Sequence, residues 1–78
     1  MAKVKVYSTP TCPYCKIAKA FLQENKIEFE DIDVSVNQAA AQEMISKSGQ
    51  MGVPVVDIDG QIIVGFDKRR IMSALGLK

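Results

Sequence analysis

The sequence predicts an α/β domain, and three observations support this prediction. Candidate strands and helices alternate along the chain, which is typical of strands and helices packed in layers. Asp59-Gly60 separates two apolar segments and is a strong signal for a two-residue β-hairpin turn. The length of 78 residues suits one domain, over residues 1–78. We therefore expect a mixed sheet whose elements follow the order βαβαββα.

The first half of the chain predicts a strand, a helix and a second strand. The first strand spans about Val4 to Tyr7, with Val4 and Val6 on one face. A helix up to Glu24 follows, and Asn25 is a plausible left-handed residue at its end. The apolar stripe of this helix comprises Ile17, Ala18, Phe21 and Leu22.

The second strand spans about Ile27 to Ile32, and its alternation breaks near Asp31, as in an edge strand or at a bulge. The right-handed crossover rule makes the first two strands a parallel pair. A capping box over Ser35–Gln38, with Val34 as the staple residue, predicts the start of the next helix.

The second half of the chain predicts a helix, a hairpin and a last helix. Gly49 would end the helix that runs through Ile45. The hairpin strands are then Val53 to Ile58 and Gln61 to Val64. Asp67 is the expected N-cap of the last helix. That helix buries Ile71, Met72 and Leu75 and ends at Gly76.

The composition excludes several classes of protein. A net charge of +1 gives no basic footprint for nucleic acid, and 47% apolar residues argue against a disordered chain. No segment approaches the ~20 apolar residues that a membrane span needs. The start of the chain, Met1 to Lys5, lacks the apolar run of a signal peptide, so we expect a cytoplasmic location. Thiols are kept reduced there, which disfavours a structural disulfide.

The only two cysteines form a C-x-x-C motif, Cys12-Pro13-Tyr14-Cys15, between the first strand and the first helix. A C-x-x-C at such a junction in a small chain indicates a redox pair. Proline favours the first helical position, which places Cys12 at the N-cap. Its sulfur would then accept hydrogen bonds from the backbone N–H groups of Tyr14 and Cys15. The helix end stabilises an anion there by at most ~2 kcal/mol.

This placement predicts different roles for the two thiols. Cys12 would attack a substrate disulfide as a thiolate, and Cys15, one turn further along the helix, would resolve the mixed disulfide. Lys16 and Lys19 could support the anion, but exposed lysines are screened by salt.

Three other interpretations of the cysteine pair stay open. A structural disulfide would close a very short loop and stabilise the chain by only ~2 kcal/mol. Half of a metal site is a second possibility, but such sites need four ligands, and the chain has two cysteines and no histidine. The cysteines could also be simple packing residues. We expect no resident metal and no tightly bound cofactor.

Thr11 to Lys16, just after a strand, resembles the glutaredoxin family, whose dithiol branch has the motif C-P-Y-C. Gly52-Val53-Pro54 resembles the T-V-P loop of the family, and Gly65-Phe66-Asp67 resembles its G-G-x-D segment. The order of elements also matches, so the resemblance covers the whole chain.

The resemblance implies a thioredoxin fold with a four-stranded mixed sheet and three helices, and a cis peptide bond before Pro54. It implies a monomeric electron carrier in cell redox homeostasis that reduces protein disulfides and glutathione mixed disulfides, with glutathione as co-substrate. Val53 would then pair its backbone with an extended substrate. The implied glutathione groove comprises Tyr14, Val53, Pro54, Gly65, Phe66 and Asp67.

The sequence departs from the family pattern at four positions. Thr9 replaces a lysine, Gly52 a threonine, Val64 a glycine and Lys68 an aspartate. An acid-to-base change disfavours a ligand ammonium group at that position. The pair Gly65-Phe66 is similar to glutaredoxin-like proteins recharged by a thioredoxin-reductase-type flavoprotein. That electron source is therefore an alternative, and an iron–sulfur cluster carrier acting through Cys12 is a more distant one.

Overall fold

The computed structural model describes residues 3–76. The elements follow the predicted order: β1 (Val4–Ser8), α1 (Pro13–Glu24), β2 (Glu30–Asp33), α2 (Gln38–Ser48), β3 (Val55–Ile58), β4 (Gln61–Val64) and α3 (Lys68–Leu75). The predicted domain over residues 1–78 and the expectation about the N-terminal segment include residues 1–2 and 77–78, which lie outside the described residues.

The four strands form one mixed sheet in the order β2-β1-β3-β4. Strands β1 and β2 run parallel, whereas β1–β3 and β3–β4 are antiparallel pairs. The predicted mixed sheet, its parallel pair and the edge position of β2 are thus confirmed. Asp59 and Gly60 both have positive φ, 51° and 90°, as the predicted hairpin turn requires.

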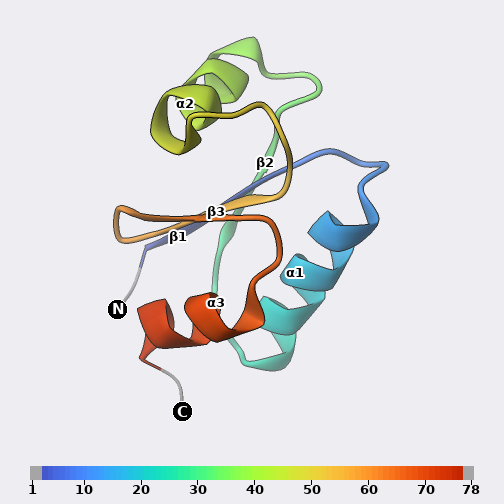
Figure 1. Cartoon of the computed structure of the whole chain (residues 1–78). Helices are drawn as coiled ribbons and strands as arrows, with labels where there is room; N and C mark the ends of the chain where they lie inside the picture. Colours follow the sequence, from blue (N-terminus) through green and yellow to red (C-terminus); the bar gives the residue numbers. More distant parts are fainter. Residues whose placement is uncertain (1–2, 77–78) are drawn as a thin grey trace.

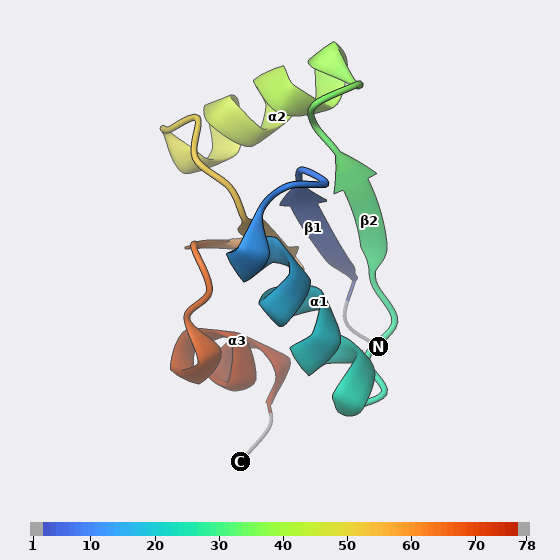
Figure 2. The same ribbon diagram turned by 90° about the vertical axis from the view of Figure 1, so that its right-hand side faces the viewer.

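Helices cover both faces of the sheet (Figure 1). Helices α1 and α3 lie against one face and α2 lies against the other, and the view turned by 90° shows the same arrangement (Figure 2). Along β1, Val4 and Val6 face the α1/α3 side, as predicted, and Tyr7 faces α2. Two clusters therefore form the core, one on each face. Within residues 3–76, no helix is long and apolar enough to cross a membrane.

The apolar cluster on the α1/α3 side is the larger one. Its buried members are Val4, Val6, Leu22, Val56, Ile58, Ile63 and Ile71. Ile17 was predicted to lie on the apolar stripe of α1, and this was wrong: it is 46% exposed. The rest of the predicted stripe is confirmed: Ala18 and Leu22 are buried, and Phe21 is partly buried and packs against this cluster. Cys15 is also buried on this helix.

Two predicted strand boundaries and one predicted backbone conformation were wrong. Strand β2 begins at Glu30 rather than near Ile27, because the preceding residues turn inward and pack against the core. Strand β3 begins at Val55, after Pro54, which has no backbone N–H to donate to a neighbouring strand. Asn25 is the C-cap of α1, as predicted, but it is not left-handed (φ −93°); the left-handed residue is Lys26, with φ 57°.

The predicted capping box before α2 was also wrong. Asn37, not Ser35, is the N-cap, and its side chain accepts a hydrogen bond from Ala40 N–H at 3.0 Å. Ser35 instead donates its backbone N–H to Asp33 at 2.9 Å, within the turn that follows β2. Ser35 and Asn37 are both residue types that favour the N-cap, and the observed start of α2 at Gln38 identifies Asn37 as the cap.

Candidate functional site

Cys12 occupies the N-cap of α1, as predicted, with Pro13 as the first helical residue. Its backbone is extended (φ −90°, ψ 112°), which aims the side chain back at the first turn. The sulfur accepts a hydrogen bond from Cys15 N–H with an N···S distance of 3.2 Å. Tyr14 N–H, the second predicted donor, is not a partner. The sulfur therefore lies where backbone N–H groups favour an anion.

Cys15 lies behind Cys12 and is fully buried, whereas Cys12 is half-buried. Both are free thiols. Burial raises the pKa of the Cys15 thiol to about 11, and the hydrogen bond with Cys12 acts in the same direction. At neutral pH Cys15 is therefore a protonated thiol, and Cys12 is the thiol that a substrate can reach.

The Val53–Pro54 loop lies directly beside Cys12. The Cys12 thiol is 3.9 Å from the carbonyl oxygen of Val53, within reach of a weak S–H···O contact. The peptide bond between Val53 and Pro54 is cis, as the resemblance implied. The carbonyl of Pro54 in turn accepts a hydrogen bond from Gly65 N–H at 2.8 Å. The structure thus brings Cys12, Val53, Pro54 and Gly65 together from three separate segments.

Gly65 has φ 76°, a backbone conformation that L side chains rarely adopt. A Cβ atom built at this position would have no neighbouring atom within 4 Å, so open space lies in front of the backbone. This is compatible with the implied role of Gly65 in leaving room for a ligand, and the positive φ is an independent reason for glycine.

The other three predicted groove residues differ in their surroundings. Tyr14 is 63% exposed on the first turn of α1. Phe66 is half-buried and packs edge-on against Phe21, with ring centroids 5.9 Å apart, so it belongs to the core as well as to the loop. Asp67 caps α3 by accepting Arg70 N–H at 3.1 Å, as predicted. Phe66 and Asp67 therefore both have structural roles.

Two of the departures from the family pattern can be followed in the structure. The carbonyl of Thr9 accepts Cys12 N–H at 3.3 Å and so helps to shape the turn before the helix. The ammonium of Lys68 lies 5.6 Å from the centre of the Phe21 ring, a cation–π contact that links α3 to α1.

Lys19 was expected to be exposed and screened, and this was wrong. Its side chain is 22% exposed, and its ammonium bonds both Ser8 and Asp31. Lys16 is exposed, as expected. The spacing of four residues from Cys15 to Lys19 is the signal that could have identified Lys19, because such residues share a helix face.

No cluster of three or more His, Cys, Asp or Glu side chains among residues 3–76 could hold a metal ion. The groups that the site offers for chemistry include two thiols, the backbone dipoles at the start of α1 and the backbone of the Val53–Pro54 loop.

Comparison with known proteins places this site in a family. The glutaredoxin family model matches residues 4–63, which is most of the chain. The chain belongs to the glutaredoxin family. An uncharacterised glutaredoxin-like 8.6 kDa protein from the rubredoxin operon of Clostridium pasteurianum is 52% identical over 68 residues, which cover 87% of this chain and 91% of that protein.

Two further matches agree with this assignment. Glutaredoxin 3 of Escherichia coli K12 is 41% identical over 76 residues, which cover 97% of this chain and 92% of that protein. The crystal structure of a point mutant of a thioredoxin-like protein superimposes with a TM-score of 0.92 at 33% identity, over 100% of both chains. The chain is thus a glutaredoxin-like redox protein with a thioredoxin-like fold, as the motif around Cys12 suggested.

Proposed function

We propose that this chain is a thiol–disulfide oxidoreductase in which Cys12 is the nucleophile and Cys15 the resolving thiol. The observation that carries the proposal is the hydrogen bond from Cys15 N–H to the Cys12 sulfur at the start of α1, with Cys15 buried behind it. A thiolate, not a thiol, attacks a disulfide, and this position favours the thiolate.

The proposed substrates are oxidised proteins and mixed disulfides of glutathione. An extended substrate would run along the Val53–Pro54 loop, where the carbonyl of Val53 lies 3.9 Å from the Cys12 sulfur. Backbone pairing of this kind accepts many sequences, because it reads main-chain groups. We propose that the protein works as a cytoplasmic monomer without a resident cofactor.

The test is a pair of cysteine variants assayed on two substrates. Cys12→Ser should abolish the reduction of both a protein disulfide and a glutathione mixed disulfide, because the other of the two cysteines, Cys15, is fully buried. Cys15→Ser should retain turnover of the glutathione mixed disulfide with external glutathione and lose most reduction of the protein disulfide. Retained activity of Cys12→Ser would show that the assignment of the nucleophile is wrong.

The proposed glutathione groove is formed by Tyr14, Val53, Pro54, Gly65, Phe66 and Asp67. The structure supports some of these six residues more strongly than others. Val53, Pro54 and Gly65 are linked to one another and to Cys12, whereas Asp67 already accepts the backbone N–H of Arg70. A carboxylate has several lone pairs, so capping leaves Asp67 able to accept a further hydrogen bond from a ligand.

A second electron source, a flavoprotein reductase of the thioredoxin-reductase type, is favoured by two substitutions in the site. Thr9 supplies no positive charge for a glutathione carboxylate, and Lys68 supplies a positive charge where the family has a negative one. Both changes weaken charge complementarity to glutathione and leave the cysteine pair intact.

Turnover with each reductant on a common disulfide substrate decides between the two sources. Lys68→Asp should raise glutathione-driven turnover and leave reductase-driven turnover nearly unchanged. Arg69→Asp is the matched control, because it makes the same charge change one residue away. Equal responses of both variants would mean that the net charge of α3, and not the position of Lys68, sets the preference.

A further inference from the structure

A polar cluster lies beside the cysteine pair, on the side where α1 faces β1 and β2. Ser8, the last residue of β1, is only 2% exposed, and its hydroxyl bonds Asp31 Oδ1 at 2.9 Å. The ammonium of Lys19 donates hydrogen bonds to Asp31 Oδ2 at 3.1 Å and to Ser8 Oγ at 3.3 Å. Three elements thus hold one ammonium group in a defined place.

The place of this ammonium group is significant because of Cys15. Lys19 follows Cys15 by one helical turn and lies on the same face of α1. The Cys15 thiol is fully buried, and a buried thiol resists ionisation. A fixed positive charge near a buried thiol acts through a poorly screening medium and is worth more there than at the surface.

We propose that Lys19, held in place by Ser8 and Asp31, is a positioning residue for the resolving step and promotes ionisation of the Cys15 thiol. This inference rests on the proposed function, in which Cys15 attacks the mixed disulfide formed at Cys12. It assigns a role to a side chain that touches neither the substrate nor the reacting sulfur atoms.

The resolving step shows what Lys19 must assist. The thiol of Cys15 loses its proton, and its sulfur forms a bond to the Cys12 sulfur. The bond between Cys12 and the substrate sulfur breaks, and the departing thiolate takes up a proton. The cysteine pair is oxidised by two electrons, and the substrate sulfur is reduced to a thiol. Only ionised Cys15 attacks, so its thiolate fraction sets the rate near neutral pH.

The groups that act on Cys15 come from α1 and from the turn before it. Burial and the Cys12 sulfur raise the pKa of Cys15, whereas a backbone hydrogen bond from Thr9 and the charge of Lys19 lower it. When Cys12 is bound to a substrate it carries no charge, and its repulsion of a Cys15 thiolate disappears. Lys19 is then the charged side chain that favours the reactive form.

Asp31 has two opposing effects on this arrangement. Its carboxylate holds the ammonium of Lys19 in place, and its negative charge offsets part of the attraction between Lys19 and a Cys15 thiolate. Replacing it with asparagine removes the charge and keeps an oxygen that can accept from Lys19. Removing the charge of Lys19 should therefore slow the resolving step, whereas removing the charge of Asp31 should speed it.

Stopped-flow reaction of the reduced protein with one equivalent of Ellman's reagent separates the two steps. The first release of thionitrobenzoate reports attack by Cys12, and the second reports displacement by Cys15. Cys15→Ser, which should show only the first release, identifies the phases. The rate of the second phase is followed from about pH 6 to about pH 11, because burial raises the pKa of Cys15 to about 11 in the reduced protein and the loss of the Cys12 charge lowers it in the mixed disulfide.

Lys19→Met should slow the second phase about three- to tenfold near pH 7. Its pH profile should shift to higher pH by the equivalent amount, at most about one pH unit for a tenfold change. Rates should converge at alkaline pH, and Lys19→Arg should retain the wild-type profile. Asp31→Asn should speed the second phase modestly. Lys16→Met is the matched control, because it removes the same charge beside Cys15 from an exposed position, and it should change the rate less than about twofold.

Three results would overturn the inference. The first is a Lys19→Met profile no different from that of Lys16→Met. The second is a uniform slowing of Lys19→Met at every pH, which would indicate distorted structure rather than lost charge. The third is equal slowing by Lys19→Met and Asp31→Asn. Absence of the first phase in the wild-type protein would instead contradict the proposed function.

Discussion

The two faces of the sheet are covered in different ways. Helices α1 and α3 cover one face with the larger apolar cluster and the edge-on pair of Phe21 and Phe66. Helix α2 covers the other face with a smaller cluster around Tyr7 and Met44 and with a network of charged groups. The cysteine pair, with its proposed redox role, lies at the start of α1, on the face that is held mainly by apolar packing.

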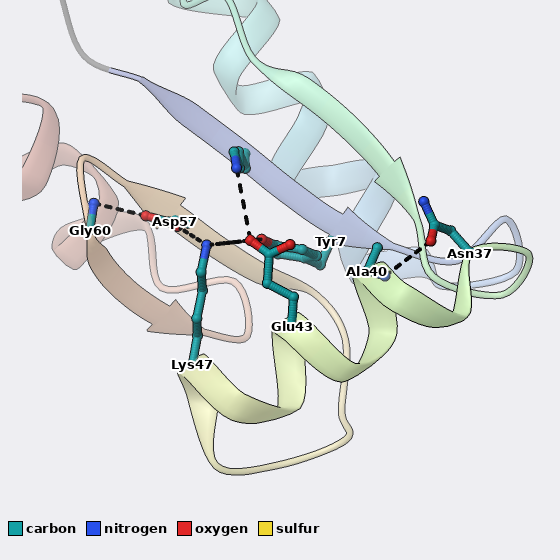
Figure 3. A network of polar contacts seen from close by, with 8 residues as sticks. Tyr7, Asn37, Ala40, Glu43, Lys47, Asp57 and Gly60 are labelled. Carbon is teal, nitrogen blue, oxygen red and sulfur yellow. Dashed lines mark hydrogen bonds and ion pairs between the residues drawn. The ribbon is translucent and has the colours of Figure 1, made fainter.

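The network on the α2 face is centred on Lys47 (Figure 3). Its ammonium bonds Asp57 at 2.7 Å, Glu43 at 2.9 Å and the hydroxyl of Tyr7 at 3.1 Å. Asp57 also accepts Gly60 N–H at 2.8 Å, which links the network to the hairpin turn. One short helix is thereby tied to β1 and β3 through polar groups.

The electrostatics of the network follow from these contacts. Hydrogen bonds to Asp57, Glu43 and Tyr7 raise the pKa of Lys47. Burial would raise the pKa of Asp57, but hydrogen bonds from Lys47 and Gly60 and the charge of Lys47 outweigh it, and the net shift is downward. The hydrogen bonds of Glu43 with Lys47 and Tyr7 lower its pKa as well. The α2 face should therefore depend on pH more than the α1/α3 face does.

The largest expected effect is on the apolar face. Leu22→Ala removes a fully buried side chain of α1 and should lower the free energy of unfolding by about 2–5 kcal/mol. Ile17→Ala is the matched control on the same helix, because Ile17 is 46% exposed, and it should lower it by less than about 1 kcal/mol. Urea unfolding of the reduced proteins measures both, and equal losses would contradict the burial pattern of α1.

The next effect is on the charged network. Lys47→Met leaves the carboxylate of Asp57, which is only 10% exposed, without its cation and should lower the free energy of unfolding by about 1–3 kcal/mol at pH 7. Asp57 and Glu43 have depressed pKa values in the folded state. They stabilise it above their unfolded pKa values, and this contribution is lost as the pH falls below about 5.

Urea unfolding as a function of pH tests this account. The wild-type protein should lose stability on acidification, and Lys47→Met should lose less over the same range, because its carboxylates have lost the partner that lowers their pKa values. Part of the loss should persist in the variant, because hydrogen bonds from Ser35 lower the pKa of Asp33 independently of Lys47. Parallel curves for the two proteins would show that the network does not control the acid response.

The smallest expected effect distinguishes two candidates for the start of α2. Asn37→Ala removes the observed cap and should lower the free energy of unfolding by about 1 kcal/mol, whereas Ser35→Ala should change it by no more than about 0.5 kcal/mol. Thermal or urea unfolding at neutral pH measures the difference. A larger loss for Ser35→Ala would restore the capping box that the sequence predicted and place the helix start two residues earlier.

Local signals were reliable where neighbouring residues decide the conformation. The C-P-Y-C motif predicted Cys12 at an N-cap with Pro13 following it, and Asp59-Gly60 predicted the hairpin turn. The predictions failed where two local candidates compete. Ser35 and Asn37 are both good caps, and Asn25 and Lys26 are adjacent at the end of α1, so small differences in backbone geometry decide between them.

The order of the elements, the position of Cys12 at the N-cap and the hairpin turn could be predicted from the amino-acid sequence, because they depend on contacts within a few residues. The tertiary structure alone decided which polar groups meet. Lys19 joins Ser8 and Asp31, and Lys47 joins groups from β1 and β3, because the fold brings distant segments within hydrogen-bond distance. A charged side chain that the sequence pattern assigns to solvent can therefore be held in place by polar groups of distant strands.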